Sequence, residues 1–225
     1  MTKVRDLDQV LDVAARLFGE RGYEATRLDD IARELGVLKG SLYYYTSSKA
    51  DLLRHINGRR LSELIDNVST ILESHASARE RLERILREHL RFIDLYHPES
   101  SQWFEPMTTT TRRTPRTRGE PPPDAERLNH RYAALVTRAV EDGQRSGEFR
   151  HELDPKVAAL GLLGASNWLT RWYEKGGRLG VEEISDTLVT MLLHGLTTDV
   201  EDAGLGDARP DLGYGGNTTG PSSAS

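Results

Sequence analysis

The side chains that point most directly to binding chemistry lie at residues 39–44, which read Lys-Gly-Ser-Leu-Tyr-Tyr. Leu42 is the apolar residue of this short helical pattern and is expected to face the core. The other side chains are therefore expected on the outer side of the helix. A lysine, a serine and two tyrosines there offer hydrogen bonds to phosphates and base edges, and a glycine permits close backbone approach. A small helical bundle with exposed tyrosines is the alternative, although a solvated tyrosine cluster is uncommon without a partner.

The charge around this stretch also favours a polyanion. Residues 27–60 contain seven Lys and Arg against four Asp and Glu, although the whole chain has a formal net charge of -5. Much of the excess acid lies in residues 199–225, which contain five Asp and Glu and one Arg. The local field therefore suits a nucleic acid better than the net charge suggests.

Three short helices must position these side chains. Apolar residues recur with helical spacing from Leu7 to Phe18, and Gly22 suits the end of that helix. A second helix is predicted after Thr26 as N-cap and ends at Gly36, and a third is predicted over 39–45. Two short helices joined by a tight glycine-containing turn are typical of a helix-turn-helix unit, whose second helix enters the major groove.

The rest of the chain also has helical periodicity, so the sequence predicts an all-α protein. Helix starts are expected at Ser48, at Ser77 and at Asp154-Pro155. The helix from Pro155 is predicted to run to about Glu174. A helix is also expected at about 128–143, a last helix over about 181–198 and a mobile loop over 97–123. The chain is predicted to have three parts: a DNA-binding domain at 1–47, a ligand-binding and dimerisation domain at 48–200 and a disordered tail at 201–225.

The first fifty residues resemble the DNA-binding domain of TetR-family regulators. The resemblance rests on RLDDIARELGV at 27–37, KGSLYYY at 39–45 and SKADLL at 48–53, together with Phe18, Gly22 and Thr26. Two positions depart from the family pattern: Thr46 stands where an aromatic residue is usual, and Ser47 where proline is frequent. The resemblance implies a homodimer that binds a palindromic operator, usually as a repressor released by a small ligand.

The resemblance also implies roles for single residues. Lys49 lies in the first turn of a predicted helix, where both its ammonium group and the free backbone N–H groups favour binding of a phosphate. By position, the phosphate contacts are Thr26, Tyr43 and Lys49, the groove-facing candidates are Leu38, Lys39, Gly40, Ser41 and Tyr44, and Arg27 completes the DNA-binding set.

In such regulators the last two helices usually pair with those of a second copy. Gly161, Gly164 and Ala165 would allow close helix approach here. The last helix has an apolar stripe made of Ile184, Leu188, Met191, Leu192 and Leu196. Together they predict a dimer surface, and ordinary intramolecular core is the alternative for each residue.

A ligand site is predicted around Trp168, Arg171 and Trp172, which share one helical face. An arginine between two tryptophans suggests an anionic ligand, with cation–π packing as the alternative. This region resembles TetR-family regulators of lipid or steroid catabolism, whose effectors are often acyl-CoA esters. Arg112, Arg113, Arg116 and Arg118 would then contact ligand phosphates or form a solvated charge run. The full candidate set is His89, Phe92, Tyr96, Trp103, Phe104, Asn167, Trp168, Arg171 and Trp172, with a satisfied core histidine as the alternative for His89.

Enzymatic chemistry is not expected. The chain has no cysteine, and its seven histidines have no metal-ligand spacing. There is no glycine-rich phosphate loop or nucleophile elbow, and therefore no cofactor or metal is expected. The chain shows neither a signal peptide nor an apolar run long enough to span a membrane, which favours the cytoplasm. A ligand-binding module without operator recognition and an all-α enzyme with an unrecognised site are the alternatives.

Overall fold

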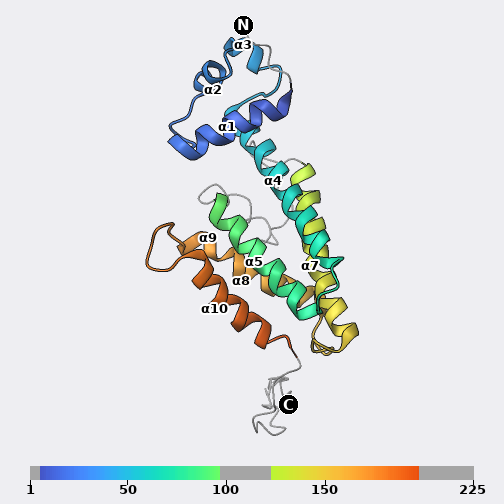
Figure 1. Ribbon diagram of the computed structural model, residues 1–225. Helices are drawn as coiled ribbons and strands as arrows, with labels where there is room; N and C mark the ends of the chain where they lie inside the picture. Colours follow the sequence, from blue (N-terminus) through green and yellow to red (C-terminus); the bar gives the residue numbers. More distant parts are fainter. Residues whose placement is uncertain (1–5, 97–122, 198–225) are drawn as a thin grey trace, which may run out of the picture.

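The computed structural model describes residues 6–96 and 123–197, with side chains from residue 126 onward in the second range. Within these ranges the regular elements are helices, and Phe149 and Thr197 form a single β-bridge. The predicted all-α class is confirmed (Figure 1). The helices are α1 (Leu7–Arg21), α2 (Leu28–Glu34), α3 (Lys39–Leu42), α4 (Lys49–Leu72), α5 (Ala78–Tyr96), α7 (Pro123–Ser146), α8 (Pro155–Asn167), α9 (Leu169–Trp172) and α10 (Val181–His194).

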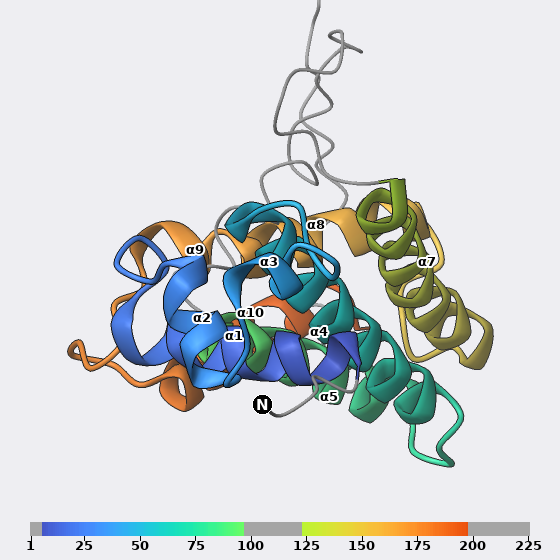
Figure 2. The ribbon, with the colours of Figure 1, turned by 90° about the horizontal axis from the view of Figure 1, so that it is seen from above.

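Two hydrophobic cores lie along the molecule and share α4. The first contains side chains of α1–α3 together with Leu52, Leu53 and Ile56 of α4. The second begins at Leu61 and includes side chains of α5, α7, α8, α9 and α10. Figure 2 shows α1–α3 gathered around the start of α4, and Figure 1 shows α4 continuing beside α7. Residues 57–60 therefore separate the two cores along α4, and α4 connects the helix-turn-helix unit to the other helices.

Side-chain caps begin several helices at the predicted places. Ser48 Oγ accepts from the backbone N–H of Asp51 at 3.1 Å, and Asp154 accepts from that of Val157 at 2.8 Å. Ser77 and Glu80 bond each other's backbone N–H at 3.0 and 3.1 Å, which is a complete capping box. These bonds satisfy donors that have no partner inside the helix, so the predicted starts are confirmed.

Several predicted helix limits were wrong. The N-cap of α2 is Arg27 rather than Thr26, because Asp30 reaches back to the Arg27 N–H at 3.0 Å. The third helix ends at Leu42 and not at 45, and the last ends at His194 and not at 198. The helix from Pro155 is interrupted at Trp168, where a tighter turn separates α8 from α9. The predicted loop and the tail at 201–225 lie in segments outside the described residues.

Candidate functional site

An exposed surface forms around α3, at the end of the molecule opposite α10 (Figure 1). Leu42 is 1% exposed and anchors α3 to the first core, whereas Tyr44 is 86% exposed and Leu38 is 65% exposed. Lys39, Gly40, Ser41 and Tyr43 are exposed as well. The sequence thus folds α3 with one buried contact and an outer side that is free to meet a partner.

Gly40 makes this outer side especially open. A Cβ atom added to it would have no heavy atom within 4 Å. Nothing in the fold of this domain therefore requires a glycine here, and its φ is not in the left-handed region. The space that the missing side chain leaves is available to a partner's backbone or bases.

Two lysines flank the exposed side of α3, and they are held differently. Lys39 pairs with Asp29 at 3.0 Å, and this bond raises the pKa of Lys39, which keeps it cationic. Lys49 Nζ donates to the carbonyl of Tyr23 at 2.7 Å and lies 4.2 Å from the centre of its ring. Lys39 is half-exposed, and the Lys49 side chain is 22% exposed. Lys49 is thus fixed at the start of α4, whereas among the described residues Lys39 is held by a surface ion pair with Asp29.

Thr26 does not lie on this surface. It is 1% exposed, and its hydroxyl is 2.9 Å from the carbonyl of Gly22 and 3.2 Å from that of Leu17. The hydroxyl therefore closes the turn after α1 and is not placed to contact phosphate, contrary to the role that the resemblance implied. Arg27, the next residue, is exposed.

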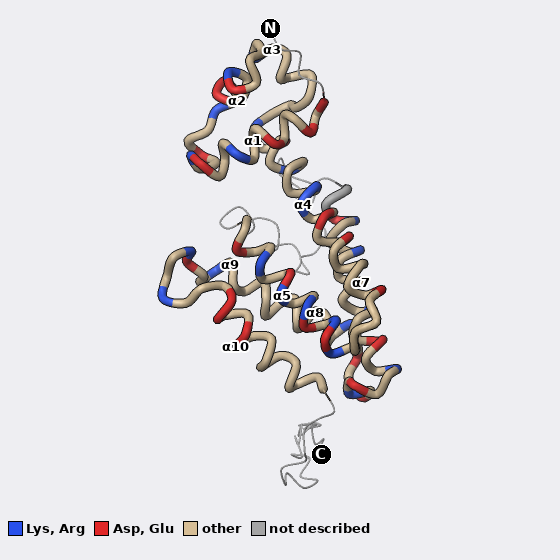
Figure 3. The backbone as a smooth tube through the Cα atoms, in the orientation of Figure 1, with Lys and Arg blue, Asp and Glu red and all other residues tan. Residues whose placement is uncertain are grey.

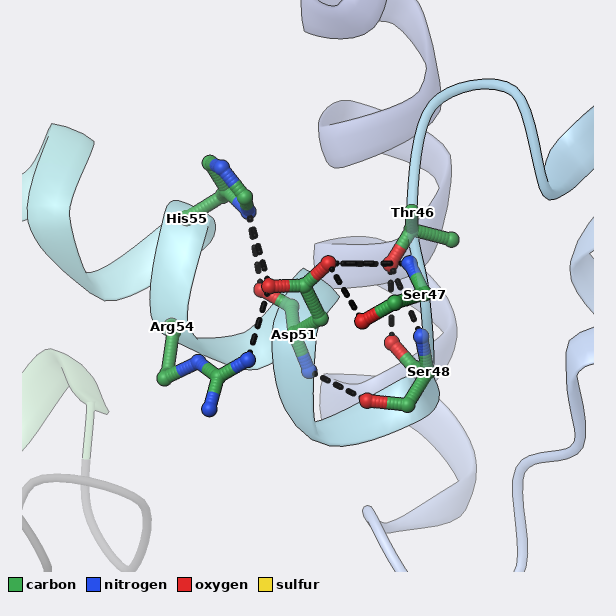
Figure 4. A network of polar contacts seen from close by, with 6 residues as sticks. All are labelled: Thr46, Ser47, Ser48, Asp51, Arg54 and His55. Carbon is green, nitrogen blue, oxygen red and sulfur yellow. Dashed lines mark hydrogen bonds and ion pairs between the residues drawn. The ribbon is translucent and has the colours of Figure 1, made fainter. Parts of the chain in front are cut away.

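The loop between α3 and α4 is organised by Asp51 (Figure 4). Its carboxylate accepts from the Ser47 N–H at 2.9 Å and from Arg54 at 2.8 Å, and Thr46 Oγ1 lies 3.3 Å away. Partial burial raises the pKa of Asp51, but the hydrogen bonds from Arg54 and Ser47 outweigh burial and hold that pKa below its usual range. His55 adds a contact from Nδ1 to the Asp51 carbonyl at 2.9 Å.

This network explains the departure from the family pattern at Thr46. The residue is 3% exposed, and its hydroxyl donates to the Ser48 carbonyl at 2.8 Å. A polar bond thus closes the loop at the position where an aromatic ring is usual. The loop sets the path of the chain from α3 into α4.

The predicted ligand residues separate into different places. His89 and Asn167 meet in the second core, where His89 Nε2 lies 2.8 Å from Asn167 Oδ1. Phe92 and Tyr96 contact each other edge to face on α5. Trp168 is 64% exposed and Trp172 is 49% exposed, so these rings lie on the outside of this chain. Arg171 is exposed beside them, and Trp103, Phe104 and the four loop arginines lie outside the described residues.

Tyr132 was missed as a site candidate. Its hydroxyl lies 2.9 Å from His89 Nδ1, and the two rings stack with centroids 5.5 Å apart. The sequence pattern places Tyr132 on the buried face of its helix. A buried tyrosine hydroxyl needs a hydrogen-bond partner, and this requirement is the signal that would have found it.

The residues of the predicted dimer surface differ in their exposure. Val157 and Leu160 on α8 and Met191 on α10 are exposed, and Cβ atoms at Gly161 and Gly164 would meet nothing. Two members of the predicted stripe are instead buried in the second core: Ile184, on the side of α10 that packs there, and Leu196, which lies beyond the end of α10. Leu188 and Leu192 are half-buried. The C-terminal half of α10 carries no Lys, Arg, Asp or Glu (Figure 3).

Comparison with known families gives two matches that together span most of the described chain. A family model described as "Bacterial regulatory proteins, tetR family" matches residues 10–56. A second model, described as "Tetracyclin repressor-like, C-terminal domain", matches residues 75–196. The first range covers the helix-turn-helix unit, and the second covers the helices of the second core.

Individual relatives align over nearly their full length. The HTH-type transcriptional repressor KstR2 of Rhodococcus jostii is 28% identical over 190 residues, which are 84% of this chain and 90% of that protein. A solved TetR/AcrR-family regulator from Thermobifida fusca is 34% identical, with a TM-score of 0.69, over 84% of this chain and 97% of the other. FadR from Bacillus subtilis, solved in complex with stearoyl-CoA, is 21% identical, with a TM-score of 0.65, over 84% and 99% of the two chains, a likeness of fold.

Proposed function

The chain belongs to the TetR family of bacterial regulatory proteins, and from this premise we propose that it is a homodimeric repressor released from a palindromic operator by a small effector. Membership makes it a DNA-binding transcriptional regulator and not an enzyme. No helix in the described ranges is long and apolar enough to cross a membrane. We place the protein in the cytoplasm, where it meets its operator.

The exposed side of α3 is the observation that carries the DNA-binding part of the proposal. A major groove admits one helix, and residues near the N-terminus of that helix contact base edges. We assign this contact to the exposed residues Leu38, Lys39, Gly40, Ser41 and Tyr44. Tyr43 and Lys49 are assigned to the flanking phosphates, and the exposed Arg27 is assigned to the same surface.

A second copy is required because a palindrome has two half-sites. The recognition helices of such a dimer must enter successive major grooves, which lie about 34–36 Å apart. We assign the dimer contact to α8 and α10, since both expose apolar side chains and α8 adds two open glycines. Burial of these side chains between two copies would supply the stabilisation.

We assign the effector to the acyl-CoA esters. The relative solved with stearoyl-CoA shares the fold, and the repressor KstR2 aligns with this chain over 90% of its own length. Trp168, Arg171 and Trp172 would lie beside the nucleotide part of such a ligand at the surface. For complete release the ligand must bind the low-affinity form of the protein about 10⁴-fold more tightly than the DNA-bound form.

Selection of genomic DNA fragments by the purified protein tests the proposal. The selection is repeated with saturated acyl-CoA esters from butanoyl to stearoyl. Enrichment of one palindrome that disappears with an ester is expected. A palindrome that no ester affects contradicts the effector class alone, and no enrichment favours a ligand-binding module without operator recognition.

Lys49→Ala and Lys39→Ala are expected to affect DNA binding in different ways. Loss of a phosphate contact at Lys49 should weaken binding to all sequences alike and lower the salt slope by about 1. Loss of Lys39 should relax the preference at one operator position, by about tenfold. Competition binding with operators changed at single positions, over a range of salt concentrations, measures both effects. Uniform losses from both variants would contradict the assignment of Lys39 to base contacts.

Leu160→Arg is expected to break the dimer, because it places a charge in the apolar surface of α8. Leu95→Arg is the matched control, since Leu95 is also an exposed leucine but lies on α5. Light scattering should give twice the chain mass of 25.2 kDa for the wild type and the control, and the single mass for Leu160→Arg. A dimeric Leu160→Arg protein would place the interface elsewhere.

A further inference from the structure

Three polar side chains form a chain of hydrogen bonds inside the second core. Tyr132 of α7 and His89 of α5 are 0% exposed, and Asn167 of α8 is 4% exposed. The Tyr132 hydroxyl lies 2.9 Å from His89 Nδ1, and His89 Nε2 lies 2.8 Å from Asn167 Oδ1. Each residue comes from a different helix, so the packing of three helices holds the network in place.

The donors in this network all point towards Asn167. Burial lowers the pKa of His89 to about 4, so the neutral ring carries one proton. With that proton on Nε2, the ring donates to Asn167 Oδ1, and Nδ1 accepts from the Tyr132 hydroxyl. Every member then has a partner except Asn167 Nδ2, which is buried and meets no acceptor in the part of the chain that the structure describes. A buried amide without an acceptor is unfavourable, and a ligand oxygen would correct this.

The ligand group beside Asn167 Nδ2 must be a hydrogen-bond acceptor that carries no negative charge. A carboxylate would have to leave water for a network that contains no cation, because His89 is neutral. The nearby Glu88 carboxylate, which raises the pKa of Tyr132, would also repel it. A carbonyl oxygen has no such cost and accepts the hydrogen bond that Asn167 has to give.

The position of Asn167 suits a ligand that is only partly buried. The residue ends α8, and the next residue, Trp168, is 64% exposed. Asn167 is thus adjacent in the chain to a residue at the surface. A ligand whose polar end stays in solvent would therefore have to reach inward by only one residue to place a carbonyl beside Asn167. An acyl group attached to a large hydrophilic carrier has this form.

We infer that Asn167 Nδ2 donates a hydrogen bond to an uncharged carbonyl oxygen of the effector, so that the protein binds the acyl ester and rejects the free acid. The inference rests on the acyl-CoA class of effector proposed above, and it adds Asn167 as the residue that recognises the carbonyl group of that effector. Tyr132 and His89 are positioning residues, since they hold the Asn167 amide with its nitrogen turned away from the network. The carbonyl belongs either to the thioester or to a ketone on the acyl part.

Calorimetric titration of the full-length protein without DNA tests this contact. The tightest-binding straight-chain acyl-CoA is compared with its S-alkyl-CoA thioether, which lacks only the carbonyl oxygen. A ring-bearing pair, oxocyclohexylpropanoyl-CoA and cyclohexylpropanoyl-CoA, tests a ketone in the same way. Each pair is measured with the wild type, Asn167→Asp and Asn57→Asp. Asn167→Asp keeps an acceptor for His89 and removes the amide donor, with a proton taken up by His89 balancing the new carboxylate. Asn57 is the matched control because it is another buried asparagine whose Nδ2 has no partner.

The wild type is expected to prefer the carbonyl-bearing member of one pair by about tenfold or more. This preference should vanish in Asn167→Asp and persist in Asn57→Asp, and the free acid should bind at least tenfold more weakly than the ester. Equal affinities within both pairs for the wild type overturn the inference without use of any variant, as does a preference that survives in Asn167→Asp. Failure of every ester to bind the wild type overturns the proposed effector class, and with it the inference, and is a distinct result.

Discussion

Gly40→Leu is expected to abolish specific operator binding while the protein stays folded. A side chain at Gly40 meets no atom of the protein within 4 Å, so the fold has room for it. In the complex, the same side chain would occupy the space between α3 and the bases. Loss of two base contacts, each worth ~1–3 kcal/mol, corresponds to a loss of affinity of about 30-fold to 10⁴-fold.

Gly19→Leu is the matched control. Gly19 is also an exposed helical glycine with open space at its Cβ, but it lies on α1. Both changes replace glycine within a helix and should leave the melting temperature unchanged or slightly higher. Fluorescence anisotropy with labelled operator should show the loss for Gly40→Leu alone. Equal affinity for both variants would mean that α3 does not approach the bases at Gly40.

The helix-turn-helix surface was predictable because its determinants are local. Leu42 had to face the first core, and this single requirement turned the lysine, glycine, serine and tyrosines outward. The exception is Thr26, whose position before a helix suggested a cap and whose family position suggested a phosphate contact. Its hydroxyl instead bonds carbonyls of Gly22 and Leu17, and bonds of this kind depend on how the turn after α1 folds.

The candidate ligand site was less predictable because its residues are distant in sequence. Trp168, Arg171 and Trp172 are all exposed, and the periodicity of the sequence does not indicate whether a helical face is turned to the core or to solvent. The contact between His89 and Asn167 spans 78 residues, and Tyr132 joins from a third helix. The hydrogen-bonding needs of buried polar groups select such partners, and these needs become visible only when the helices are packed.

Acid is expected to destabilise the second core through His89. The pKa of His89 is about 4 in the folded protein, because burial disfavours the imidazolium, and 6.5 is the ordinary value. Between these two values the unfolded chain binds a proton that the folded chain does not, so stability falls as pH falls. The contribution of His89 is complete above pH 6.5 and is lost progressively down to about pH 4, and it amounts to roughly 3 kcal/mol over that window.

His89→Gln isolates this effect because glutamine has a donor and an acceptor but no titratable group. Urea unfolding of the wild type at pH 7 and pH 4.5 should show a drop in the free energy of unfolding that exceeds the drop for His89→Gln by about 2–3 kcal/mol. His151→Gln is the control, since His151 has a side chain 91% exposed, and it should follow the wild type. Parallel pH curves for the wild type and His89→Gln would show that His89 is not held neutral by the fold.

The same titration separates the two cores. His89 of α5 is buried among the helices of the second core, whereas the other histidines in the described residues are exposed. Acid should therefore lower the unfolding transition of the second core first, whereas the packing around Leu42 has no such group to protonate. Hydrogen exchange at pH 5 is expected to show protection lost earlier in α5, α7 and α8 than in α1. Simultaneous loss in all four helices would mean that α4 makes the two cores a single cooperative unit, in which a change at Asn167 and His89 is felt directly at the DNA-binding helices.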